Sequence, residues 1–141
     1  NIFKAVTGGT GPPPGGGGTP IHGYGGKCVD VAGANPANGT AVQLYTCNGT
    51  NAQSWTHSGN TFQALGKCLD VTAAGTANGT KVQLYDCNGT GAQQWTVGAN
   101  GSLVNTNSGK CLDDTDWSTA DGNRLQIWSC TGGANQSWTL G

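Results

Sequence analysis

The chain carries little charge of either sign: only 9% of its 141 residues are charged, and the formal net charge is −1. A nearly neutral surface offers no electrostatic footprint for nucleic acid or for an anionic membrane. No apolar run in the sequence is long enough to span a bilayer. We therefore expect neither nucleic acids nor membranes as partners.

Methionine is absent, whereas glycine occurs 26 times and threonine, asparagine and valine recur throughout. This mixture disfavours helices and favours short strands that are joined by tight turns. Four Asn-Gly pairs, at 38–39, 48–49, 78–79 and 88–89, supply residues that tolerate positive φ in such turns. The composition predicts an all-β fold.

The six cysteines fall into three pairs with an identical separation of 19 positions: Cys28 and Cys47, Cys68 and Cys87, and Cys111 and Cys130. Six cysteines allow about 15 pairings, and the constant separation favours pairing within each unit. A zinc site would need close C-x₂₋₄-C pairs, which this sequence lacks, so we expect no metal and no cofactor. Disulfides persist in oxidising compartments, which predicts a secreted, extracellular protein.

An internal repeat is the strongest signal in the sequence. The three units read GKCVDVAGANPANGTAVQLYTCNGTNAQSWT, GKCLDVTAAGTANGTKVQLYDCNGTGAQQWT and GKCLDDTDWSTADGNRLQIWSCTGGANQSWT. Their first cysteines and their final tryptophans both recur after 40 and then 43 residues. We expect repeats at about 21–60, 61–101 and 102–141.

Apolar and polar residues alternate inside each unit, which is the period of a strand. No unit could bury its apolar face alone, so the three should share one core. The expected core consists of Val29, Val31, Val42, Leu44, Trp55, Leu69, Val71, Val82, Leu84, Trp95, Leu112, Leu125, Ile127 and Trp138. Asp30, between Val29 and Val31, should point outward. Asp114 takes the core-facing place that Val31 and Val71 hold in the other repeats.

The segment 8–20, GGTGPPPGGGGTP, precedes the repeats. It cannot bury apolar surface, so we expect a linker. Residues 1–7 read as the end of a different domain. The sequence thus predicts the end of an upstream domain and a linker at 1–20, and a binding domain at 21–141. The upstream domain is expected to be catalytic and to belong to the same polypeptide.

The Cys-x-Asp opening and the Gln-x-Trp ending of every unit resemble the ricin B-chain lectin family, whose members in bacterial enzymes are called family 13 carbohydrate-binding modules. The resemblance covers about residues 21–141. It implies a β-trefoil of three disulfide-containing repeats with twelve strands and pseudo-threefold symmetry. It also implies up to one shallow sugar site per repeat, named α, β and γ in chain order.

The resemblance assigns carbohydrate-binding residues to each repeat. They are Asp30, Gln43, Tyr45, Asn48 and Gln53 in α, Asp70, Gln83, Tyr85, Asn88 and Gln93 in β, and Asp113, Gln126, Trp128, Asn135 and Gln136 in γ. Only γ has the asparagine of the family pattern, because α and β carry Ala52 and Ala92 there. Asn48 and Asn88 could compensate with a polar contact, but γ is expected to be the strongest site.

These residue types suit a sugar, since an aromatic plane packs against the C–H face of the ring and a carboxylate accepts hydrogen bonds from vicinal hydroxyls. Simpler roles remain open. The aspartates could cap turns, the site aromatics could be ordinary strand residues, and the glutamines could hold the fold. Trp117 could flank the γ site or cover the core.

We interpret the chain as a non-catalytic module that anchors a secreted bacterial glycoside hydrolase to polysaccharide. An enzyme is the less favoured reading, because glycosidases need two opposed carboxylates and three of the seven acids belong to the repeated motif. A free-standing lectin or adhesion subunit is the other alternative, which the linker disfavours. A monomer is expected, and the ligand is left open among xylan, a galactose-containing glycan, an arabinan and a β-1,3-glucan.

Overall fold

The computed structural model describes residues 18–140, and the expectations for residues 1–17 lie outside this range. Twelve strands are present: β1 (Ile21–His22), β2 (Cys28–Val31), β3 (Thr40–Tyr45), β4 (Thr56–Ser58), β5 (Thr61–Ala64), β6 (Lys67–Val71), β7 (Val82–Tyr85), β8 (Trp95–Val97), β9 (Leu103–Asn105), β10 (Lys110–Asp114), β11 (Asn123–Trp128) and β12 (Thr139–Leu140). No α-helix occurs in the described range, and the all-β prediction is confirmed.

Short 3₁₀ turns connect the strands: η1 (Tyr24–Gly26), η2 (Ala32–Ala34), η3 (Asn51–Gln53), η4 (Thr72–Ala74), η5 (Gly91–Gln93), η6 (Ala99–Gly101), η7 (Thr115–Trp117) and η8 (Ala134–Gln136). Within residues 18–140, no helix has the length and apolar character needed to cross a membrane.

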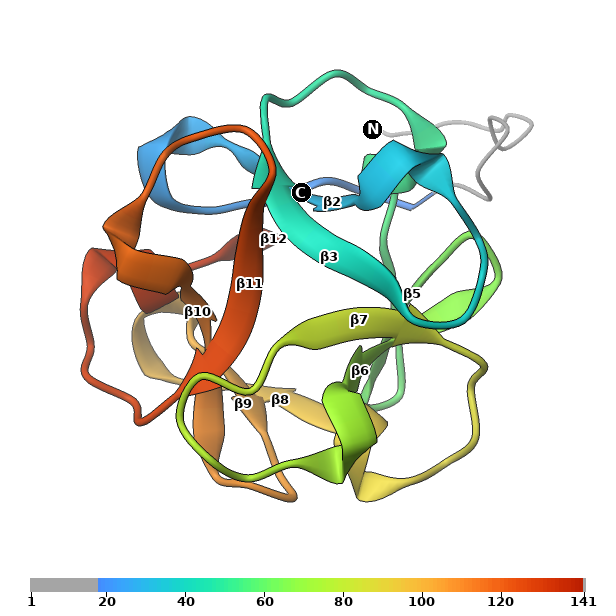
Figure 1. Ribbon diagram of the computed structural model, residues 1–141. Coiled ribbons are helices and arrows are strands. Elements are labelled where there is room, and N and C mark those ends of the chain that lie inside the picture. Colours follow the sequence, from blue (N-terminus) through green and yellow to red (C-terminus); the bar gives the residue numbers. More distant parts are fainter. Residues whose placement is uncertain (1–17, 141) are drawn as a thin grey trace.

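Each repeat contributes four strands, and the three lobes surround a common centre in Figure 1. β3, β7 and β11 enclose that centre, with β3 paired to both β7 and β11. A bridge between Lys81 and Gln126 links the second repeat to the third. The two ends of the described chain also meet, because β1 pairs with β12. The predicted β-trefoil of three repeats is confirmed.

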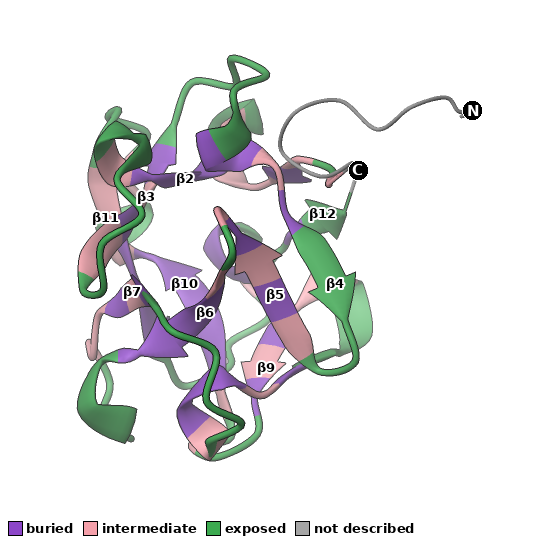
Figure 2. Cartoon of the chain, turned by 90° about the vertical axis from the view of Figure 1, so that its right-hand side faces the viewer, coloured by how far each residue is buried: buried purple, intermediate pink, exposed green. Residues whose placement is uncertain are grey.

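The buried core residues lie mostly on the strands, and most of the connecting loops are exposed (Figure 2). Every predicted core residue is buried, so the alternation located the core correctly. The structure adds Ile21, Phe62, Ala64 and Leu103 from outside the repeated motif, and Ala52 and Ala92 from within it. Asp114 is also fully buried, at the place that Val31 and Val71 occupy in the other repeats.

The final tryptophan of each repeat packs in the core and has its indole N–H satisfied. Trp55 donates to the carbonyl of Val29 over 2.9 Å, and Trp95 donates to that of Leu69 over 3.1 Å. Trp138 makes the same bond, of 3.0 Å, to Leu112. A buried indole needs such a partner, so these bonds place the Gln-x-Trp ending against the opening strand of its own repeat.

All three predicted disulfides form within repeats, as Cys28–Cys47, Cys68–Cys87 and Cys111–Cys130. The Asn-Gly pairs make the expected turns, with φ of +89° at Gly39 and +90° at Gly79. Thr19 pairs with Trp55 through hydrogen bonds of 2.8 and 2.9 Å, so contacts of the trefoil begin just before residue 21.

Candidate functional site

The hairpin of each repeat places an aspartate directly opposite a glutamine. Asp30 faces Gln43 across β2 and β3, and the same register joins Asp70 to Gln83 and Asp113 to Gln126. The glutamine Nε2 donates to the aspartate Oδ1 over 2.9 to 3.0 Å in all three repeats. One cross-strand acid-amide pair therefore lies at the same place in every lobe.

The expectation that Asp30 points outward is wrong. Asp30, Asp70 and Asp113 are buried, with only 4 to 5% of their surface exposed. The physical reason is that the Gln-x-Trp segment folds back over the hairpin, so that Gln53 donates to Asp30 Oδ2 over 2.9 Å. Buried carboxylates need such donors. Each aspartate therefore accepts hydrogen bonds on both of its carboxylate oxygens.

The glutamine of each Gln-x-Trp segment is occupied by internal hydrogen bonds. Gln53 Nε2 donates to Asp30 and to the Thr46 carbonyl, and its Oε1 accepts from the Asn48 N–H over 2.9 Å. Gln93 and Gln136 repeat this arrangement. These hydrogen bonds hold the aspartate and the segment around the second cysteine of each repeat in place.

The site aromatics are exposed at the ends of the central strands. Tyr45 and Tyr85 each have 38% of their surface exposed, and Trp128 has 40%. In β3, β7 and β11 these residues follow a buried apolar position, so the strand alternation directs them outward. Tyr45 and Trp128 line surface cavities next to the aspartates of their own repeats.

The α cavity has a volume of about 360 Å³. Four of the predicted binding residues line it: Asp30, Gln43, Tyr45 and Asn48. Asn48 Oδ1 accepts from both the N–H and the hydroxyl of Thr50, so this oxygen holds a turn. Asn88 does the same in the second repeat. The structure also adds α-lining residues that the sequence analysis missed: Gly33, Ala34, Thr50 and Asn51.

The γ cavity is smaller, about 240 Å³, and is lined by Asp113, Asp116, Trp117, Gln126, Trp128, Thr131 and Asn135. Asp116 and Thr131 were not predicted. Asp116 lies three residues after the site aspartate, where α and β have Gly33 and Ala73, and only this comparison between repeats could have singled it out. Of the two roles left open for Trp117, the structure supports the flanking one.

Asn135 is the residue that distinguishes γ. Its Nδ2 donates to Asp113 Oδ2 over 3.1 Å and to the Asp114 carbonyl over 3.2 Å. Its Oδ1 is buried and has no hydrogen-bond partner among residues 18–140, although the side chain lines the cavity. An unpaired buried carbonyl is costly, so a hydroxyl donor that reached this oxygen would bind favourably.

A charged side chain of the second repeat, Lys81, also contacts the γ site of the third. Lys81 Nζ donates to Gln126 Oε1 over 2.9 Å, which orients the Gln126 amide with its N–H toward Asp113. Across the equivalent strand contacts, Gln43 lies beside Arg124 and Gln83 lies beside Ala41. The three acid-amide pairs are thus alike within each repeat and different in their neighbours.

A second buried acid stands behind the γ site. Burial raises the pKa of the Asp114 carboxyl to about 6, Asn123 lowers it by hydrogen bonding, and the charge of Asp113 raises it further. Asp114 Oδ1 accepts from Asn123 over 2.7 Å, while Oδ2 has no partner among residues 18–140. A carboxyl in this setting favours its protonated form, because the oxygen without a partner is costly when charged.

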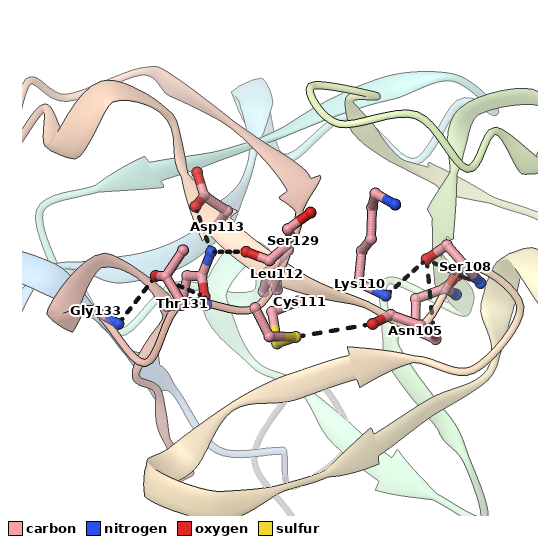
Figure 3. The surroundings of a disulfide bond; sticks show 12 residues. Asn105, Ser108, Lys110, Cys111, Leu112, Asp113, Ser129, Thr131 and Gly133 are labelled. Carbon is pink, nitrogen blue, oxygen red and sulfur yellow. Dashed lines mark hydrogen bonds between the residues drawn. A yellow bond between two sulfur atoms is a disulfide. The ribbon is translucent and has the colours of Figure 1, made fainter.

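The γ disulfide, Cys111–Cys130, lies near Asp113, Ser129 and Thr131 (Figure 3). Thr131 N–H donates to Gln136 Oε1 over 2.8 Å, and Gln136 Nε2 donates both to Asp113 and to the Ser129 carbonyl. Cys130 falls between Ser129 and Thr131, so the bridge fixes the segment that orients Gln136. In the described range, the one grouping of metal-ligand residue types is His22 with Cys28 and Cys47, whose sulfurs are already joined in a disulfide.

A shallow cavity that combines a clamped carboxylate, amides and an exposed aromatic plane matches the polar edges and the C–H face of a sugar ring. The fold and the repeated site together define a carbohydrate-binding β-trefoil. Residues 18–138 match the ricin-type beta-trefoil lectin domain family, and the chain belongs to this family. A comparison with curated protein sequences found no match.

Solved structures give the same fold. The designed threefold-symmetric protein ThreeFoil is 33% identical, with a TM-score of 0.78 over 86% of this chain and 96% of the designed one. A non-toxic homologue of type II RIPs from bitter gourd (Momordica charantia), in complex with α-methyl-D-galactoside, is 32% identical, with a TM-score of 0.79 over 87% of this chain and 46% of its own.

An exo-β-1,3-galactanase from Clostridium thermocellum is 29% identical, with a TM-score of 0.75 over 86% of this chain and 29% of the enzyme. The present chain thus spans less than half of the bitter gourd protein and less than a third of the galactanase.

Proposed function

We propose that this chain is a non-catalytic carbohydrate-binding module that anchors a secreted glycoside hydrolase to polysaccharide. The proposed binding role rests on the arrangement of residues at the γ site. Asn135, whose buried Oδ1 has no hydrogen-bond partner among residues 18–140, lines one cavity with Asp113 and the exposed Trp128. A sugar placed there would stack on Trp128, donate a hydroxyl to Asn135 and use the remaining accepting capacity of the Asp113 carboxylate.

The anchoring role in a secreted protein is supported by three further observations. Residues 8–20 have the Gly/Pro composition of an interdomain linker. A similar trefoil in the Clostridium galactanase makes up a minor part of a larger enzyme chain. The three disulfides suit an extracellular setting. A free-standing lectin is the second candidate, favoured by the similarity to the bitter gourd protein in complex with a galactoside.

Affinity electrophoresis through gels that contain galactan, xylan, arabinan or β-1,3-glucan tests the binding role. One similar protein is in complex with a galactoside and another is a galactanase, so a galactose-containing glycan is the first probe. We expect at least one polymer to retard the chain and Trp128→Ala to reduce the retardation, with no release of reducing sugar. Passage through all four gels without retardation would contradict the binding role.

Detection of the native protein in culture medium tests the anchoring role. An antibody against this domain should label a polypeptide well above 14.2 kDa that hydrolyses the retarding polymer. A secreted band near 14.2 kDa without hydrolytic activity would instead identify a free-standing lectin. The two experiments are independent, so binding can hold even if anchoring fails.

A further inference from the structure

The three repeats share one strained backbone position that carries different side chains. The fourth residue after each site aspartate has a left-handed backbone, with φ of +52° at Ala34, +54° at Ala74 and +59° at Trp117. A bulky residue is uncommon in this conformation and is costlier there than a small one. The core does not require it, because 49% of the Trp117 surface is exposed.

The surroundings of Trp117 are adapted to its size. Gly133 lies three residues before Gln136, where the other repeats have Thr50 and Thr90. A Cβ at Gly133 would lie 3.0 Å from Trp117 Cζ2 and 2.9 Å from Asn135 Oδ1, so glycine provides the space for both side chains. At these two positions the third repeat therefore has Trp117 and Gly133, where each of the other repeats has an alanine and a threonine.

A second contact holds the indole in place. Tyr24, in η1, meets Trp117 in an edge-to-face arrangement with ring centroids 5.3 Å apart and an interplanar angle of 86°. Such a geometry is favourable for aromatic pairs. With Tyr24 and the Gly133 backbone beside it, Trp117 is a pre-positioned aromatic surface at the γ cavity, whose wall it forms together with Trp128.

An acid accompanies this extra aromatic. Asp116 lines the same cavity, and its carboxylate accepts no hydrogen bond from residues 18–140. The equivalent residues in the other repeats, Gly33 and Ala73, have no polar side chain. The mouth of γ thus carries a second pairing of a carboxylate with an aromatic plane, beside the first pairing of Asp113 with Trp128.

We propose that Asp116 and Trp117 extend the γ site by one sugar unit, so that γ holds two neighbouring sugar rings. This inference rests on the proposed sugar-binding function. The ring next to the one on Trp128 stacks on Trp117, and Asp116 accepts hydrogen bonds from the hydroxyls of that ring. The γ site therefore prefers disaccharides and longer chains to monosaccharides.

The test isolates γ in a Tyr45→Ala/Tyr85→Ala background and titrates it by calorimetry with methyl galactoside and β-1,3-galactobiose, and with methyl xyloside and xylobiose. For the sugar series that binds, the disaccharide should bind roughly 5- to 10-fold more tightly than the monosaccharide. Trp117→Ala, which installs the residue of the other two repeats, should remove this difference, so that the affinities for monosaccharide and disaccharide agree within about twofold.

Indole N–H signals in NMR spectra separate the two subsites, since the chain has five tryptophans and three of them are buried in the core. A monosaccharide should shift the Trp128 signal, and a disaccharide should shift those of both Trp128 and Trp117. A disaccharide that moves Trp128 alone, or a Trp117→Ala variant that loses both ligands equally, would overturn the extended site while sugar binding stands. If no probe moves either signal, the proposed function itself fails.

Discussion

Asp121, in the third repeat, accepts a hydrogen bond of 2.8 Å from the backbone N–H of Thr46, in the first repeat. The residue before Thr46 is the α-site aromatic Tyr45. Equivalent bonds run from the Asp86 N–H to Asn38 and from the Ser129 N–H to Asn78, each over 2.8 Å. Each site aromatic is therefore followed by a residue that the turn of another repeat holds in place.

Asp121→Ala should weaken binding at α by roughly two- to threefold and leave γ unchanged, because it removes the bonds to Thr46 and the 2.9 Å ion pair with Lys27. Asp121→Asn is the matched control, since the other two repeats use asparagine at this place. The control should keep the hydrogen bond from the Thr46 N–H. Calorimetry in a Tyr85→Ala/Trp128→Ala background measures α alone, and equal loss in both variants would assign the effect to the ion pair.

Asp114 should make stability fall as the pH rises. Its pKa is about 6 in the folded protein against an ordinary 3.8, so between these values the folded state binds more protons than the unfolded state. Stability gained from this group is complete below about pH 4 and is lost by about pH 6, a change of roughly 3 kcal/mol. Urea unfolding of the native chain and of Asp114→Asn at pH 4 and pH 7 measures it.

The difference in unfolding free energy between the native chain and Asp114→Asn isolates the contribution of Asp114 from that of the other titrating residues. We expect Asp114→Asn to gain stability relative to the native chain on moving from pH 4 to pH 7. A pH-independent difference would mean that the Asp114 carboxyl has the same pKa in the folded and unfolded chain.

Asn135→Ala should reduce γ affinity about fivefold, since it removes a hydrogen-bonding group worth roughly 1 kcal/mol. The fold should tolerate the change, because Ala52 and Ala92 are buried at the same place in the other repeats. The reciprocal Ala52→Asn should strengthen α by a similar factor. Calorimetry of both variants with a monosaccharide checks the pair, and an unchanged γ affinity in Asn135→Ala would contradict the expected ranking of the sites.

Polymer binding should exceed oligosaccharide binding by about tenfold or more, because three sites on one rigid body can engage a chain together. Tyr45→Ala, Tyr85→Ala and Trp128→Ala each remove one exposed aromatic and should lower polymer affinity in steps. The affinity of each remaining site for an oligosaccharide should stay constant. Equal affinities of the unmodified chain for polymer and oligosaccharide would mean that only one site works.

The sequence by itself determined the features that repeat within a short stretch of chain. The constant separation of Cys28 and Cys47 and its copies gave the disulfides, and the alternation around Val42 and Leu44 gave the core. The Asn-Gly pairs gave the turns. These features follow from local periodicity and from turn chemistry, which act between residues close in sequence and are present in three concordant copies.

Only the tertiary structure decided how the repeats modify one another. Asp30 is buried because Gln53 folds back over it, and Lys81 and Asp121 act on sites in other repeats. Trp117 could have covered the core, and only its contacts with Tyr24 and Gly133 place it at the γ cavity. Burial, pKa and the neighbours of a site depend on which distant segments meet, and residue types along one strand do not specify that meeting.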